Sequence, residues 1–142
     1  MQQREDRGAS SIELVILAPI VILSILLIGQ FAMWYQARHV AIAAAQAGAR
    51  VARDAPQVQG GQAWQGQATA AALTLAHQLG GSLLQGTSAQ PVGGGSQRGV
   101  EVSGTAPSII PIPGLTFHIN ETSEGPTECF RPSGDTAQCA GG

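Results

Sequence analysis

The chain has 142 residues, of which 44% are hydrophobic, only 4% aromatic and 11% charged. That length accommodates one small domain at most. The basic residues are seven Arg, the formal net charge is −2, and no basic cluster is present that would neutralise a row of phosphates, so the composition excludes nucleic-acid binding. The apolar residues are concentrated in residues 14–35, while residues 55–142 are rich in Gly, Gln, Ser, Thr and Pro. This distribution is typical of a membrane-anchored chain and not of a soluble enzyme.

Residues 14–35 form an uncharged apolar run that is long enough to cross a bilayer. At 1.5 Å per residue, the run predicts a helix of about 33 Å, against a hydrocarbon layer of about 30 Å. Trp34 and Tyr35 at its end are typical of an interfacial aromatic belt. Pro19 predicts a kink, because it removes one backbone hydrogen bond and clashes with the preceding turn. A cleavable signal peptide is the alternative, but the run exceeds the usual length of about 7–15 residues, and the small residues at 41–48 lie far beyond it.

A short polar segment, residues 1–8 with the sequence MQQREDRG, precedes the apolar run. It ends in Gly8, and Glu13 is the fifth residue after it. An unpaired carboxylate inserted at the head of an apolar span costs about 2.5–3.5 kcal/mol, which makes Glu13 a candidate functional residue with a partner. The alternative is a helix cap at the level of the lipid headgroups. Position alone leaves both interpretations open.

The order of these features resembles a type IV prepilin-type processing site. Residues 7–14, RGASSIEL, followed by Leu17, Ala18 and Pro19, are similar to the TadE-like pseudopilins of the tight-adherence (Flp) pilus system. The resemblance implies that a prepilin peptidase cleaves after Gly8 and makes Ala9 the new N-terminus. It also implies pairing of Glu13 with the freed amine of its own or a neighbouring subunit, because a carboxylate in the membrane is tolerable beside a cation. The implied partners are the membrane, the peptidase, other pilin or pseudopilin subunits and the pilus assembly platform.

Helical character continues past the apolar run. Residues 36–54 are dominated by Ala and are followed by Pro56, so we expect one long helix in residues 9–55, with Arg50 and Arg53 in water. Its many small residues at three- and four-residue spacings favour close packing against other helices. The alternative is a plain Ala-rich stalk.

The remainder divides into two regions. Residues 56–98 are interpreted as Gln- and Gly-rich linkers around a second helix at about residues 61–85, which Gly80 and Gly81 are expected to end or weaken. Its packing stripe is expected to contain Trp64, Ala68, Ala71 or Ala72, Leu75, Leu79 and Leu83. Residues 86–99 are interpreted as a flexible linker or exposed loop. Residues 99–142 are interpreted as a small β region. Alternating patterns predict strands at 99–105 and 115–120, and the prolines between them favour a sheet edge or a wide turn. Because so small a sheet is not stable alone, we expect it to pack on the second helix or on the first.

Cys129 and Cys139 flank a segment rich in turn-forming residues. In an extracytoplasmic setting they predict a disulfide worth about 2–3 kcal/mol. Free thiols and a metal site are the alternatives, although the three His residues are scattered among different predicted elements. The count of Arg residues on either side of the span does not fix the orientation. The cysteines favour a single-pass protein of the cell membrane with its N-terminus in the cytoplasm and its C-terminal part outside.

No P-loop, dinucleotide fingerprint, nucleophile elbow or paired-His motif occurs in the sequence, so we expect no enzymatic activity, cofactor, metal or small-molecule substrate. The predicted fold is α+β and membrane-anchored, with a long pilin-like N-terminal transmembrane helix, a second helix and a small antiparallel sheet. The first functional hypothesis is a structural or assembly pseudopilin, a minor or accessory component of a Tad/Flp-type pilus or a related secretion apparatus. The second is a single-span anchor that displays a small extracytoplasmic binding module. Only the first requires the spacing of Gly8 and Glu13.

Overall fold

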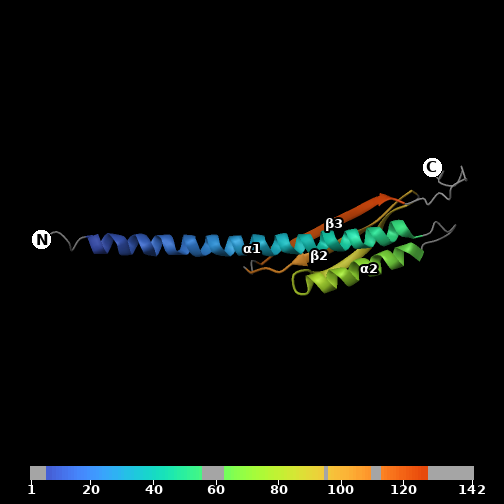
Figure 1. Ribbon diagram of the computed structural model, residues 1–142. Helices are drawn as coiled ribbons and strands as arrows, with labels where there is room; N and C mark the ends of the chain where they lie inside the picture. The colour runs from blue at the N-terminus through green and yellow to red at the C-terminus, as the bar shows by residue number, and fades with distance from the viewer. Residues whose placement is uncertain (1–5, 56–62, 95, 110–112, 128–142) are drawn as a thin grey trace, which may run out of the picture.

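The computed structural model describes residues 6–55, 63–94, 96–109 and 113–127. These residues form two helices and three strands: α1 (Asp6–Asp54), α2 (Ala63–Gly80), β1 (Gln85–Gly94), β2 (Gln97–Ala106) and β3 (Phe117–Pro126) (Figure 1). The predicted α+β fold, with a long apolar N-terminal helix, a second helix and a small antiparallel sheet, is confirmed. Cys129 and Cys139 lie outside the described residues, so their disulfide stays a prediction.

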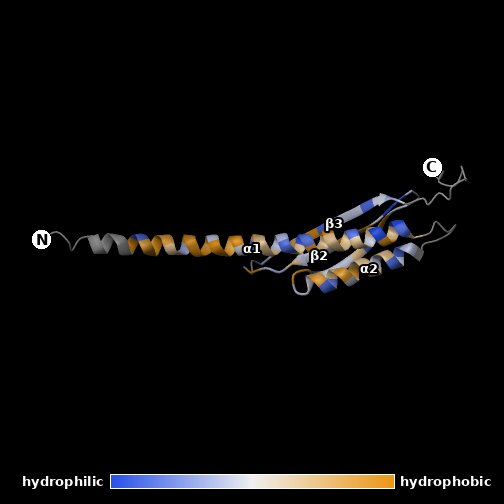
Figure 2. Cartoon of the chain, in the orientation of Figure 1, coloured by the Kyte–Doolittle hydropathy of each residue, from blue (hydrophilic) through white to orange (hydrophobic). Residues whose placement is uncertain are grey.

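α1 has two parts with different surroundings. Every side chain in residues 12–28, which we call the projecting segment, is exposed, whereas one face of the helix is packed against the rest of the chain from Gln30 onward. Figure 2 shows that the projecting segment is largely apolar and that the remainder, which we call the head (residues 30–55 of α1, α2 and the sheet), is mixed. The helix is unbroken through Pro19, and the kink expected there stays a prediction. Ser24 satisfies its hydroxyl by donating to the Ile20 carbonyl at 2.8 Å.

The two helices contact each other through small side chains. On α2, the buried residues recur at every fourth position: Trp64, Ala68, Ala72, Ala76 and Gly80. On α1, the fully buried face is almost entirely Ala: Ala37, Ala41, Ala44, Ala45, Ala49 and Ala52. Small residues allow two helix backbones to approach closely. The close packing that the small residues of α1 predict therefore occurs within the chain, between α1 and α2.

The leucines of α2 do not form its packing face, which corrects the predicted stripe. Leu79 is 52% exposed, and only Trp64 among the large residues of that stripe is buried within the helix. The larger side chains would hold α2 farther from α1, so the Ala edge is the one that fits. α2 ends at Gly80, where the two glycines were expected to end or weaken a helix that could reach about residue 85. It ends there because Gly81 adopts a positive φ of 46° and donates its N–H to the His77 carbonyl.

The sheet has the order β1-β2-β3, and both neighbouring pairs are antiparallel. β2, close to the predicted strand at 99–105, lies at the centre, with Val100 and Val102 completely buried against the helices. The predicted loop at 86–99 is wrong, because most of it forms β1 and the start of β2. Backbone hydrogen bonds to β2 hold this Gly-rich segment, and Pro91 is tolerated because β1 is an edge strand. β3 begins at Phe117 and extends beyond the predicted residue 120, since its polar second half still pairs with β2.

Both helices cover the same face of the sheet: α1 lies against β2 and β3, and α2 lies against β1 and β2 (Figure 1). Arg98 on β2 lies beside the C-terminal end of α1. It is 8% exposed, donates to the Ala55 carbonyl at 3.2 Å and lies 5.3 Å from the centre of the Trp64 ring. A cation beside the C-terminal end of a helix is favourable. Arg53 is half-buried and therefore less available to water than predicted, since Gly125 on β3 leaves room for its side chain.

At Gly48 the three elements α1, α2 and β2 approach one another closely. A Cβ at this position would lie 2.8 Å from the Ala68 carbonyl oxygen and 2.9 Å from Val100 Cγ2. We expect Gly48→Ala to lower the free energy of unfolding of the head by about 1–3 kcal/mol, because the helices must separate. Thermal unfolding of the purified protein in detergent, followed by circular dichroism, measures the change.

Gly66 provides the matched control. It is exposed on α2, and a Cβ there meets nothing within 4 Å. Gly66→Ala is expected to stabilise the head by about 0.5–1 kcal/mol through helix propensity alone. A Gly48→Ala protein that is stabilised as much as the Gly66→Ala protein would contradict the close packing.

Candidate functional site

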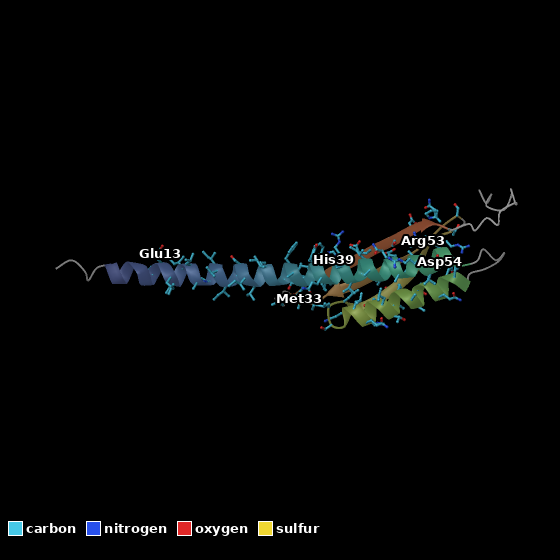
Figure 3. The ribbon with its side chains drawn as sticks, in the orientation of Figure 1. Glu13, Met33, His39, Arg53 and Asp54 are labelled. Carbon is cyan, nitrogen blue, oxygen red and sulfur yellow. The ribbon has the colours of Figure 1, made fainter. Side chains whose placement is uncertain are left out.

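The predicted processing and assembly residues lie on one stretch of helix. Because α1 begins at Asp6, the peptide bond between Gly8 and Ala9 belongs to its first turn. Glu13 follows Ala9 by four residues, a rise of about 6 Å along the helix. Its side chain is exposed. Figure 3 shows Glu13 on the part of α1 that projects away from the head, whereas His39, Arg53 and Asp54 lie beside the sheet.

Aromatic rings gather where the projecting segment joins the head. The Phe31 ring centre is 5.8 Å from that of Trp34 and 6.3 Å from that of Tyr35, and Tyr35 contacts the edge of His39 with centres 4.4 Å apart. Phe31 and Tyr35 remain 64% and 49% exposed. The residues expected to form an interfacial belt therefore lie along one side of α1 at the base of the head.

Next to Phe31, the side chain of Gln30 binds the backbone of the connection between β2 and β3. The sequence analysis did not predict this contact. Its side-chain amide donates to the Pro107 carbonyl at 3.2 Å, and its Oε1 accepts the N–H of Ile109 at 2.7 Å. Gln30 is only 6% exposed, so both hydrogen bonds are largely shielded from water. An amide side chain within an apolar run is a signal for such a contact, because a buried amide needs partners.

An ion pair lies on the other side of the aromatic cluster. Arg38 Nε donates to Glu121 Oε1 at 2.7 Å, and the guanidinium lies 5.9 Å from the centre of the Trp34 ring. The side chains are 46% and 22% exposed. An exposed pair of this kind contributes about 0–1 kcal/mol to stability. It joins α1 to β3 by one direct contact.

An apolar groove of about 470 Å³ opens beside Gln30. Its lining combines one side of α1 with the residues around the start of β3: Leu27, Gln30, Phe31, Trp34, Leu115 and Phe117. Gln30 is the one lining residue with a polar side-chain amide, and that amide already binds the backbone at Pro107 and Ile109. The groove therefore suits a hydrocarbon chain or an apolar side chain and not a polar small molecule.

The described residues contain no group of three or more His, Cys, Asp or Glu residues that could hold a metal ion. His118 is exposed on β3, where its ring lies within hydrogen-bonding distance of two threonine hydroxyls, Thr116 at 2.8 Å and Thr105 at 3.5 Å. Neither neighbour is a carboxylate that would orient the ring as a base.

The long helix also carries the similarity to known proteins. Residues 8–50 match the TadE-like protein family. This match confirms the resemblance drawn from the residues around Gly8 and Glu13, and it suggests a Tad pilus-associated component. The TadE-like match covers most of α1 and ends before α2 and the sheet. No curated protein matches the chain, and no solved structure matches it.

The described residues contain one helix that is long and apolar enough to cross a membrane, and it lies near the N-terminus. Within the TadE-like segment, the apolar stretch is the projecting segment, none of which is buried against the head. Together these features are those of a single-pass membrane protein whose head is attached at one end of its span.

The hydrogen bonds of Gln30 generate a prediction. Gln30→Ala removes the two hydrogen bonds that the Gln30 side chain makes with the Pro107 carbonyl and the Ile109 N–H. Leaving a backbone group unsatisfied in a site shielded from water costs about 1–3 kcal/mol. We therefore expect the amide of Ile109 to exchange with deuterated solvent much faster in the variant. Hydrogen exchange measured by mass spectrometry on the detergent-solubilised protein tests this.

The control for this experiment is Gln36→Ala, because Gln36 lies on the same helix but is exposed. It is expected to leave the exchange of Ile109 unchanged. Equal exchange in the wild-type and Gln30→Ala proteins would show that the connection is held by other contacts.

Proposed function

We propose that the protein is a pseudopilin, a minor or accessory structural component of a Tad/Flp-type pilus or a related secretion apparatus. The observation that carries the proposal is the match of residues 8–50 to the TadE-like family, over a segment that includes both Gly8 and Glu13. The head favours a minor or accessory role, since α2 and the sheet are more than a bare pilin helix carries. The proposal assigns the protein no catalytic activity.

The exposed projecting segment supports an assembly role. Its side chains, from Ile12 to Ile28, are exposed on all sides of the helix. So large an apolar surface needs a partner, and lipid or neighbouring apolar helices are the two that suit it. A subunit that first resides in a membrane and then packs its helix against others uses the same surface in both states. A plain membrane anchor uses it only in the first.

The place of Gly8 in the helix supports processing by a prepilin peptidase. The bond to be cleaved lies in the first turn of α1, where few backbone hydrogen bonds must break to expose it. Gly within a helix is less stable than Ala by about 0.5–1 kcal/mol, which further favours local unwinding at the cleavage point. Cleavage would remove residues 1–8 and leave the amine of Ala9 one turn before Glu13.

The pairing of Glu13 with this new amine makes assembly depend on cleavage. Before cleavage, the nitrogen of Ala9 is an uncharged amide and offers no cation to the carboxylate. After cleavage, the ammonium on the same or a neighbouring subunit neutralises Glu13 at the membrane boundary. The mature protein would thus acquire a contact that its precursor lacks.

The proposed orientation has the N-terminus in the cytoplasm, where the peptidase acts on the leader, and the head outside. In that setting Cys129 and Cys139 would form the expected disulfide. The protein would then reside in the cell membrane as a single-pass subunit, next to other pilin-like subunits and the pilus assembly platform.

Processing is the first test. We expect the intact mass of the protein purified from membranes to correspond to a chain that begins at Ala9. Gly8→Leu should block cleavage and leave the full-length chain, because a larger side chain at the cleavage point hinders the peptidase. A wild-type protein that still begins at Met1 would contradict the pseudopilin proposal.

Glu13 is the second test. Glu13→Gln and Glu13→Val should preserve membrane insertion and leader removal, and Val should make insertion more favourable by removing a carboxylate that costs about 2.5–3.5 kcal/mol when unpaired. Crosslinking to neighbouring subunits and recovery of the pilus should fall sharply in both variants. Gln46→Ala, on the exposed side of α1 within the head, serves as the control. Normal assembly of both Glu13 variants would reduce Glu13 to a helix cap at the membrane surface.

A further inference from the structure

The connection between β2 and β3 is fixed to α1 within the apolar run. Gln30 holds the backbone at Pro107 and Ile109 through its two hydrogen bonds. Ile109 also packs against Gly29, since a Cβ on that glycine would lie 3.2 Å from Ile109 Cδ1. The contact with α1 is therefore at Gly29 and Gln30, within the apolar run, and not in the part of the helix that follows Tyr35.

The depth of this contact follows from the length of the helix. A hydrocarbon layer of about 30 Å corresponds to about 20 helical residues, so a span that starts at Leu14 ends near Met33. Gly29 and Gln30 lie before that point, inside the expected boundary of the layer. The Arg38–Glu121 ion pair lies eight residues beyond Gln30 on α1, about 12 Å farther toward water. Any segment bound at Gln30 is thus at the level where the bilayer meets water.

The composition of the connection suits this level. Residues 107–117, PSIIPIPGLTF, contain no charged residue and have three prolines. Proline has no backbone N–H, so each one removes a donor that would otherwise require a partner beside lipid. Gln30 satisfies one of the remaining donors, the N–H of Ile109, together with the carbonyl of Pro107. Irregular backbone near hydrocarbon is tolerated when its polar groups are satisfied in this way.

The apolar side chains of the connection are only partly covered by the head. Ile109 is 43% exposed and Leu115 is 46% exposed. Leu115 and Phe117 form one wall of the apolar groove, and Phe31 and Trp34 on α1 form the other. The groove is continuous with the surface of the projecting segment through Leu27, so whatever covers that segment can extend into the groove.

We propose that Ile109 and Leu115, at the two ends of the connection between β2 and β3, insert into the interfacial layer of the bilayer and that a lipid acyl chain occupies the groove. The head would then rest on the membrane surface at a fixed height, held by Ile109 and Leu115 in addition to α1. The inference rests on the membrane span of the proposed function, but it requires neither cleavage after Gly8 nor pilus assembly.

Depth-dependent fluorescence quenching tests the proposal on the full chain in nanodiscs of phosphatidylethanolamine and phosphatidylglycerol that hold one protein molecule each. Cys129 and Cys139 are replaced by Ser, and an environment-sensitive fluorophore is attached to Leu115→Cys or, independently, to Ile109→Cys. Thr122→Cys, exposed on β3, is the matched control in water, and Ser24→Cys is the control in the span. Lipids brominated on the acyl chains and aqueous iodide are the two quenchers.

The fluorophores at residues 109 and 115 are expected to be quenched by the brominated lipids, as at residue 24, and to be shielded from iodide. The fluorophore at residue 122 should show the opposite behaviour. Quenching by iodide at residues 109 and 115 that equals quenching at residue 122 would overturn the proposal. Shielding from both quenchers would also overturn it, since the connection would then be covered by protein. If the fluorophore at residue 24 is itself quenched by iodide and not by lipid, the membrane span fails, and the proposed function fails with it.

Discussion

The structure depends on one constraint, which is that α1 is a single continuous helix that serves two different environments. Its first part exposes apolar side chains on all sides and buries none of them against the head, while its second part buries only one Ala-rich face. Because the rise per residue of a helix is fixed, the distance along α1 between any two of its residues is also fixed. The height of the head above the membrane is therefore set by where the apolar run ends and where the Ala face begins.

The Ala face determines how the head is built. Large side chains would enlarge the distance between the helices, but Ala and Gly48 let α2 and β2 approach the backbone of α1 closely. Each small contact contributes little hydrophobic energy, so the core depends on many close contacts over its length and on a few larger residues such as Trp64, Val100 and Val102. This explains how a chain with so few aromatic residues forms a packed head.

The sequence predicts the parts of the fold that rest on long, uniform patterns. The apolar run and the Ala-rich continuation predict α1, and Val100 and Val102 predict the central strand, because both patterns depend on burial along one regular element. β1 was not predictable in the same way, since its Gly, Ser and Pro residues resemble a loop and its backbone pairing with β2 depends on tertiary structure. The prediction that leucines form the packing face of α2 was wrong. Leucines usually lie in a core, but the short distance between α1 and α2 leaves room only for Ala side chains on that face.

The residues of the candidate site also differ in whether a local sequence pattern predicts them. Gly8, Ala9 and Glu13 follow a local motif and are visible in the sequence, although what they do remains a proposal. Gln30 acts through residues more than 70 positions away, Pro107 and Ile109, and no local pattern connects them. The sequence shows that Gln30 is a polar residue in an apolar run and that its amide needs hydrogen-bond partners. It does not show which residues those partners are.

Cysteine accessibility measures most directly whether α1 is divided between membrane and head. In a chain with Cys129 and Cys139 replaced by Ser, Ser24→Cys probes the projecting segment and Gln46→Cys probes the exposed side of α1 in the head. With a membrane-impermeant maleimide on intact cells, the account predicts labelling at residue 46 and none at residue 24 until the membrane is dissolved in detergent. Equal labelling of both residues in intact membranes would contradict the division of α1. Labelling of residue 46 only after the cells are permeabilised would reverse the proposed orientation.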